Sequence, residues 1–171
     1  MQVDSIQKEY RPLLIPRRGE IIAWLLTLLV GAVSLVFILT GQRTPVFLWI
    51  LGLLLLSSAL LISLSNWVDR HTIIRIHPDG VEFQNGLRKV SLAWEQIQEI
   101  RIQNSEWGKR VQVYGDQAHF VFRTLGEVRL RGKLQGKMGF ENGEDILRQL
   151  VANSGLRIAD QSGDDYYYAR L

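Results

Sequence analysis

The chain has 171 residues, no cysteine, and 20 Lys and Arg against 17 Asp and Glu, which gives a formal net charge of +3. The lack of cysteine excludes disulfide bonds, thiolate metal sites and cysteine nucleophiles, and three histidines are few for a zinc enzyme. So small a positive balance leaves no electrostatic footprint for nucleic acid, and we expect no nucleic-acid partner. The mean hydropathy is near zero because a strongly apolar first third is averaged with a polar remainder.

Two long charge-free segments occupy residues 21–40 and 44–68. Since about 20 apolar residues in a helix cross roughly 30 Å of hydrocarbon, either segment can span a bilayer. A buried core helix is the alternative for both, although such long charge-free runs are rare in soluble folds. A signal peptide is disfavoured for the first, because 20 residues precede it and no small-residue cleavage site follows. We expect a transmembrane hairpin at 21–68, with helices at 21–40 and 46–65, after an N-terminal segment at 1–20.

The link between the spans is short and contains Gly41 and Pro45, which favours an antiparallel hairpin. Basic residues lie on both flanks of the hairpin, including Arg70 and Arg75 on the far side, whereas the link holds only Arg43. By the positive-inside rule, we expect both termini and the soluble domain on the cytoplasmic face of a bacterial inner membrane or its equivalent. Neither span, as delimited here, contains an ionisable group, which disfavours a transporter or a channel.

After residue 68 the pattern changes to short alternating runs separated by turn signals. Asp79-Gly80 is a turn dipeptide, and Asn85-Gly86 is a strong hairpin signal. Seven short strands are predicted, at residues 72–77, 81–84, 88–92, 98–103, 111–114, 118–124 and 127–131. Short strands in this number are typical of an antiparallel sandwich or barrel.

A helix is predicted at residues 143–154, with Asn142 as its N-cap and Gly155 as its stop. Its apolar stripe consists of Ile146, Leu147, Leu150 and Val151. A helix of about a dozen residues is unstable alone in water, so we expect the stripe to close the open end of a small barrel. Residues 157–171 follow as a polar C-terminal tail.

Residues 77–102 resemble the bacterial PH-domain proteins. These share a strand, a D-G turn, a strand, an N-G or R-G turn, and a basic-apolar segment with W-x-x-I-x-x-I, here Trp94, Ile97 and Ile100. Many of them carry a two-helix membrane hairpin just before the barrel. The resemblance implies an α+β membrane protein, with a transmembrane hairpin followed by a PH-like antiparallel β-barrel of about seven strands at 69–156, closed by the C-terminal helix.

The sequence offers no chemistry for catalysis. There is no G-x-S-x-G elbow, and His71 and His77 share one strand face without a carboxylate between them. We therefore expect no enzyme activity, no cofactor and no metal.

The architecture is also similar to that of a photosystem I assembly factor, which has a short basic N-terminus, two spans and a β-rich domain ending in a helix. We expect a membrane-anchored interaction or scaffold module, serving as an accessory subunit or assembly factor of a membrane protein complex. The alternative is binding of anionic lipid head groups.

Residues 129–137 carry four cations and two glycines and are expected to form a flexible loop. Each cation near an anionic membrane contributes about 1 kcal/mol of attraction; the alternative is a solvated loop at the barrel rim. The candidate lipid contacts are Arg129, Arg131, Lys133 and Lys137.

Exposed aromatic residues beside cations suit a membrane interface or a partner's pocket, and core packing of Trp107 against a barrel end is the alternative. Three consecutive tyrosines suit docking onto protein, and a disordered terminus is the alternative. The expected partners are membrane lipids and other membrane protein subunits. The candidate partner contacts are Trp107, Lys109, Arg110, Tyr166, Tyr167 and Tyr168.

Overall fold

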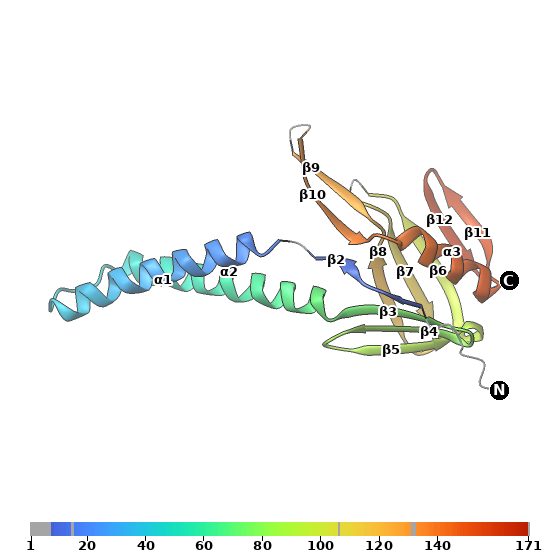
Figure 1. The fold of residues 1–171 in the computed structure, drawn as a ribbon, viewed down its shortest axis with the longest axis horizontal. Coiled ribbons are helices and arrows are strands. Elements are labelled where there is room, and N and C mark those ends of the chain that lie inside the picture. Colours follow the sequence, from blue (N-terminus) through green and yellow to red (C-terminus); the bar gives the residue numbers. More distant parts are fainter. Residues whose placement is uncertain (1–7, 15, 106, 131–132, 171) are drawn as a thin grey trace. The chain divides into compact units, whose positions relative to one another are not determined.

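The computed structural model of this chain describes residues 8–14, 16–105, 107–130 and 133–170. The chain forms two units, a helical one at Pro16–Trp67 and a β-rich one made of Met1–Ile15 and Val68–Leu171. The β-rich unit is therefore built from segments on both sides of the helices in sequence. Figure 1 shows the order of the elements along the chain.

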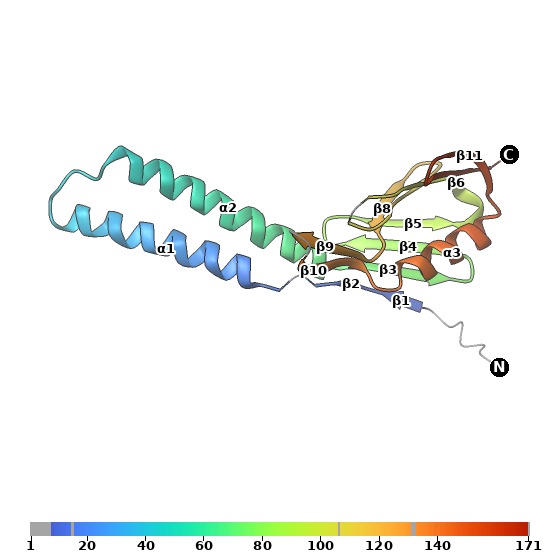
Figure 2. The ribbon, with the colours of Figure 1, turned by 90° about the horizontal axis from the view of Figure 1, so that it is seen from above.

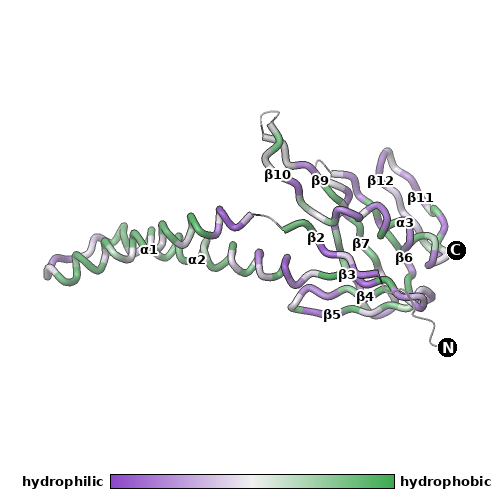
Figure 3. The backbone as a smooth tube through the Cα atoms, viewed as in Figure 1, coloured by the Kyte–Doolittle hydropathy of each residue, from purple (hydrophilic) through white to green (hydrophobic). Residues whose placement is uncertain are grey.

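The helical unit consists of α1 (Arg18–Leu39) and α2 (Val46–Arg70), and the last turn of α2 belongs to the β-rich unit. Both helices are long and apolar enough to cross a membrane, by length and composition (Figure 3). Small residues lie where α1 and α2 approach each other. Ala59 is fully buried, and a Cβ added at Gly52 would lie 3.7 Å from the Cγ1 atom of Val30.

A polar cluster joins α1 to α2. The Ser63 hydroxyl donates to one Glu20 carboxylate oxygen at 2.9 Å, and the Asn66 amide donates to the other at 2.8 Å. The Trp24 indole N–H donates to the Ser63 oxygen at 3.0 Å. The sequence analysis placed Glu20 just before the first span, whereas α1 includes it in its first turn. Because α2 supplies a donor to each carboxylate oxygen, the cluster sets the register of the two helices.

The described residues of the β-rich unit form three hydrogen-bonded antiparallel sheets. The first has the order β1-β3-β4-β5, with β1 (Lys8–Tyr10), β3 (Thr72–His77), β4 (Gly80–Asn85) and β5 (Lys89–Ala93). The second has the order β2-β10-β9, with β2 (Pro12–Leu13), β9 (Gly126–Leu130) and β10 (Lys133–Phe140). The third has the order β11-β12-β6-β7-β8, with β6 (Ile97–Gln103), β7 (Arg110–Gly115), β8 (His119–Arg123), β11 (Arg157–Ser162) and β12 (Asp165–Ala169).

The seven predicted strands coincide with β3 to β9 to within one residue at each end. The predicted closed barrel is wrong. Between β5 and β6 the 3₁₀ turn η1 (Trp94–Gln96) carries the chain from one sheet to the next. The free edge of β6 pairs with β12 instead of β5, so the sheets do not close into a ring. Residues 157–171, expected to be a tail, supply the strand that takes this edge.

The core lies between the sheets and the helix α3 (Gly143–Ser154), whose position relative to the strands is seen in Figure 2. The predicted apolar stripe is confirmed: Ile146 and Leu150 are fully buried, and Val151 packs against the core. Gly155 ends the helix with a left-handed backbone at φ 67°. Asn142 precedes the helix, but its side chain makes no capping hydrogen bond among the described residues.

Several glycines allow the backbone to pack closely around buried Thr124. A Cβ added at Gly108 would lie 2.5 Å from the Thr124 carbonyl oxygen, and one at Gly143 would lie 2.5 Å from the Thr124 Cα. A Cβ at Gly126 would overlap the Trp107 carbonyl. Only glycine leaves room for such an approach, so this junction holds the end of β8, the Trp107 loop and the start of α3 together.

We expect Gly126→Ala and Gly143→Ala each to lower the free energy of unfolding by about 1–3 kcal/mol, the usual cost of overpacking. Gly136→Ala is the matched control, because a Cβ there meets no atom within 4 Å. Thermal unfolding of the full chain in detergent, followed by near-ultraviolet circular dichroism, measures the difference. Equal melting of the three variants would contradict the junction.

An ion-pair ladder crosses the outer face of the first sheet. The Arg75 guanidinium contacts the Glu9 carboxylate at 3.0 Å and the Glu82 carboxylate at 2.8 Å, and the Lys89 amine contacts Glu82 at 2.9 Å. Hydrogen bonds from Arg11 and then Arg75 lower the pKa of Glu9. Hydrogen bonding by Lys89, and then by Arg75, lowers the pKa of Glu82. The ladder thus ties β1 to the strands that follow the helices.

A carboxylate with a lowered folded-state pKa stabilises the fold above its unfolded pKa and loses that contribution as the pH falls through the folded value. We therefore expect the Tm of the full chain to fall between neutral pH and about pH 3, and to fall less in Glu82→Gln than in the parent. Glu95→Gln, on the exposed side of η1, is the control and should follow the parent. Parallel Tm profiles for parent and Glu82→Gln would show that the ladder contributes nothing.

Candidate functional site

The outer face of the third sheet carries a row of aromatic and arginine side chains. The guanidinium carbon of Arg101 lies 5.5 Å from the ring centroids of both Tyr114 and Tyr167, and the Tyr114 and His119 rings stack at 5.7 Å. These four residues, here called the Tyr–Arg row, come from four adjacent strands: β12, β6, β7 and β8. Far-separated parts of the sequence therefore form one continuous surface.

Strand alternation places the row on the outer face. Ile100 and Ile102 are buried on either side of Arg101 in β6, so Arg101 must point outward. The same alternation separates the three C-terminal tyrosines. Tyr166 and Tyr168 pack against the core, and Tyr167 stands opposite Arg101.

Hydrogen bonds hold the row in place. The Glu99 carboxylate accepts from the Tyr167 hydroxyl at 3.1 Å and also from the Arg101 guanidinium. The bond to Glu99 raises the pKa of Tyr167, and Glu99 likewise raises the pKa of Arg101. The tyrosine therefore stays neutral and the arginine charged at physiological pH. On β7, the Tyr114 hydroxyl donates to the Gln112 side-chain oxygen at 2.7 Å.

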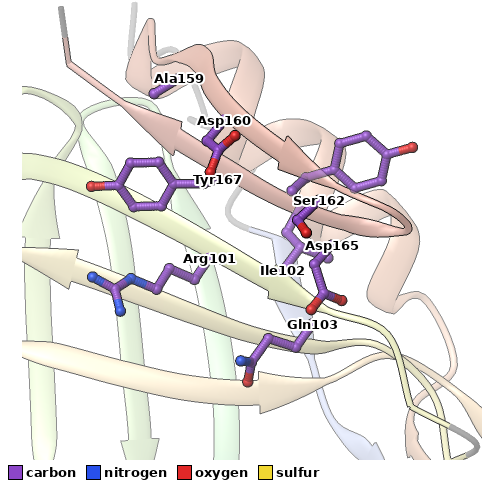
Figure 4. A pocket seen from close by; sticks show the side chains of 9 residues that line it. Arg101, Ile102, Gln103, Ala159, Asp160, Ser162, Asp165 and Tyr167 are labelled. Carbon is purple, nitrogen blue, oxygen red and sulfur yellow. The ribbon is translucent and has the colours of Figure 1, made fainter.

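A shallow depression of about 400 Å³ adjoins the row between β6 and the β11–β12 hairpin. Arg101 and Tyr167 line it together with Gln103, Asp160 and Asp165, as Figure 4 shows. The Asp165 carboxylate accepts the backbone N–H of Asn104 at 2.8 Å, which holds the hairpin turn against the end of β6. The depression is large enough for a partner's side chain and lies open to solvent.

The candidate partner contacts around Trp107 do not all lie on the face that carries the Tyr–Arg row. Trp107 is half exposed, and the Lys109 amine pairs with the Glu144 carboxylate of α3 at 2.9 Å. Arg110 begins β7 opposite Gln103 and is exposed on the same face as the Tyr–Arg row. The structure thus brings Arg110 and Tyr167 onto one face and places Trp107 at its end.

The candidate lipid contacts lie on a hairpin, where the sequence analysis expected a flexible loop. Arg129 is on β9, Lys133 and Lys137 are on β10, and Arg131 lies outside the described residues. Lys137 stands opposite Glu127 in the register. An acidic residue therefore lies beside Lys137, the candidate cation farthest from the turn of the hairpin. Leu134 on β10 is 52% exposed. Figure 1 shows this hairpin extending away from the other strands of the β-rich unit.

Arg101, Tyr114 and His119 are not among the site residues predicted from the sequence. Their outward positions follow from strand alternation in β6, β7 and β8. Their proximity to Tyr167 depends on the pairing of β12 with β6, which no local pattern signals. Among the residues that the structure describes, no group of three or more His, Asp or Glu side chains is arranged to hold a metal ion.

Comparison with known proteins locates a family within this unit. Residues 73–136 match the family described as Bacterial PH domain. The match begins in β3 and ends in β10, so the two apolar helices, α3 and the β11–β12 hairpin lie outside it. No match was found among the curated proteins or among the solved structures. Residues 73–136 of the β-rich unit are therefore similar to bacterial PH domains, and two apolar helices precede them in the chain.

Proposed function

We propose that this chain is a membrane-anchored, non-catalytic interaction module that serves as an accessory subunit or assembly factor of a membrane protein complex. The Tyr–Arg row is the observation that carries the proposal. Tyrosine and arginine are enriched at the energetic centres of protein interfaces, whereas lysine and glutamate are depleted there. The row presents a guanidinium between two aromatic rings on an exposed sheet face.

The row is also preorganised for binding. Tyr167 and Arg101 share the Glu99 carboxylate, and Tyr114 is held by Gln112. Side chains that are fixed before association lose little conformational entropy when they bind. A PH-like domain binds protein or lipid surfaces, and a flat, rigid aromatic face suits a protein surface better than a lipid head group.

Pairing between β1 and β3 supports a hairpin topology for the anchor. β1 precedes α1 and β3 follows α2, and Glu9 stands opposite Arg75 in the ladder. An open sheet cannot continue through hydrocarbon, because its edge groups would be unsatisfied there. If each helix crosses the membrane once, the segments before α1 and after α2 lie on the same side of the membrane. The basic residues of those flanks favour the cytoplasmic side.

The topology can be tested with single cysteines, since the chain has none of its own. We expect Gln42→Cys, between the helices, to react with a membrane-impermeant maleimide added to intact cells whose outer membrane has been permeabilised. Asp79→Cys, in the β3–β4 turn, should react only after lysis. Reaction of Asp79→Cys in intact cells would overturn the cytoplasmic assignment.

Lipid binding by the β9–β10 hairpin is the second candidate function. β10 runs antiparallel to β2, with Gly139 opposite Leu13. The part of the hairpin that carries Arg129 and Lys133 therefore extends beyond its pairing with β2. Cations and an exposed leucine on such a hairpin suit an anionic membrane surface.

The protein-interaction function and the lipid-binding function predict that different variants lose binding. Replacing Arg101 and Tyr114 by Thr should weaken binding of a protein partner by roughly 30-fold or more, as loss of an interface hot spot does. The measurement is quantitative mass spectrometry of proteins that co-purify with the full chain from native membranes in mild detergent. The matched control replaces Arg129 and Lys133 by Gln and should leave these partners unchanged. If the row variant retains every partner and the hairpin variant alone loses adhesion to anionic vesicles, the lipid function is favoured instead.

A further inference from the structure

The turn between β4 and β5 displays an apolar side chain that the fold does not use. Leu87 is 66% exposed, the highest value among the exposed large apolar residues of the β-rich unit. Residues 85–88 are here called the Leu87 turn. Polar residues usually fill such turns, and leucine at this position adds nothing to the core.

The Leu87 turn is rigid. Gly86 has a left-handed backbone at φ 77°, and the Asn85 side-chain oxygen accepts the backbone N–H of Arg88 at 3.0 Å and that of Leu87 at 3.3 Å. The Asn85 N–H donates to the Arg88 carbonyl at 3.1 Å. Leu87 is therefore presented in one fixed place, at a low entropic cost of binding.

The register of the first sheet places this turn beside the end of α2. Asn85 stands opposite Thr72, the first residue of β3. The Thr72 hydroxyl donates to the Val68 carbonyl in the last turn of α2 at 2.8 Å. Directly opposed residues in an antiparallel pair are about 5 Å apart, and two residues of chain span at most about 7 Å. The Leu87 turn thus lies within a few residues' length of Arg70, where α2 ends.

We propose that the Leu87 turn is a membrane-contact site that binds the surface of an anionic bilayer. This inference rests on the proposed insertion of α2. The apolar part of α2 ends near Trp67, an aromatic residue of the kind found at membrane interfaces. The head-group layer beyond it is roughly 5–8 Å thick, and β3, which pairs with the strand that leads into the turn, begins two residues after α2 ends.

The chemistry of the turn matches that surface. Leu87 would enter the boundary between head groups and acyl chains, and Arg88 would contact lipid phosphates. The Arg88 guanidinium lies 5.8 Å from the Phe83 ring centroid, which holds it near the turn. Lys89 is already paired with Glu82 at 2.9 Å, so the assignment depends on Arg88. The turn would then hold the sheet against the membrane at a point separate from the helices.

The test uses the full chain in vesicles of phosphatidylcholine, with or without phosphatidylglycerol, and single cysteines that carry a fluorophore. Leu87→Cys reports on the turn. Asp79→Cys, in the turn at the opposite end of β3 and β4, is the matched control. Ser57→Cys, within α2, reports on insertion. Quenching is measured with lipids that carry a nitroxide either at the head group or deep in the acyl chain.

We expect the deep nitroxide to quench Ser57→Cys, and the head-group nitroxide to quench Leu87→Cys several-fold more than Asp79→Cys. Adding Arg88→Gln to Leu87→Cys should reduce this quenching in vesicles containing phosphatidylglycerol. Equal quenching of Leu87→Cys and Asp79→Cys, with Ser57→Cys quenched, would overturn the contact site alone. An unquenched Ser57→Cys would overturn the membrane insertion itself. If Arg88→Gln has no effect in either vesicle, the anionic surface is the wrong ligand.

Discussion

The pairing of β1 with β3 is the constraint on which the rest of the structure depends. It joins a segment before the helices to a segment after them, with Glu9 and Arg75 both opposed in register and ion-paired. Because of this pairing, the two helices are an insertion in the sequence of a single β-rich unit. The segments before α1 and after α2 are held together by the β1–β3 pairing. The same short ladder also sets the edge of the first sheet, because β1 is its outermost strand beside β3.

The third sheet depends on a different long-range pairing. β12 takes the edge of β6, and in doing so it brings Tyr167 beside Arg101 and partly buries Tyr166 and Tyr168 against the core. A closed barrel would have used that edge for β5 and left no position for Tyr167. The pairing of β12 with β6 therefore accounts both for the open arrangement of the sheets and for the aromatic surface.

Local signals in the sequence were sufficient for the helices and for β3 to β9. Asn85-Gly86, the alternation around Ile100 and the stripe at Ile146 each identify an element without reference to distant residues. They also identify which side chains face outward. The pairing partners of β1, β2 and β12 lie far away in the chain, and β11 is exposed along its whole length, so no apolar periodicity marks it. The candidate site was recovered only in part, because Arg101 and Tyr114 become neighbours of Tyr167 only after β12 has docked.

The C-terminal hairpin also sets the order in which the chain can be completed during synthesis. β6 is made well before β11 and β12, so its edge stays unpaired until those two strands have left the ribosome. An unpaired strand edge is a template for association with other chains, and incompletely folded intermediates are the species that aggregate. Arg170, near the end of the chain, donates to the carbonyls of Trp94, Ile97 and Ser154. Loss of these last residues would therefore remove both the strand that covers the edge of β6 and the Arg170 contacts that hold it.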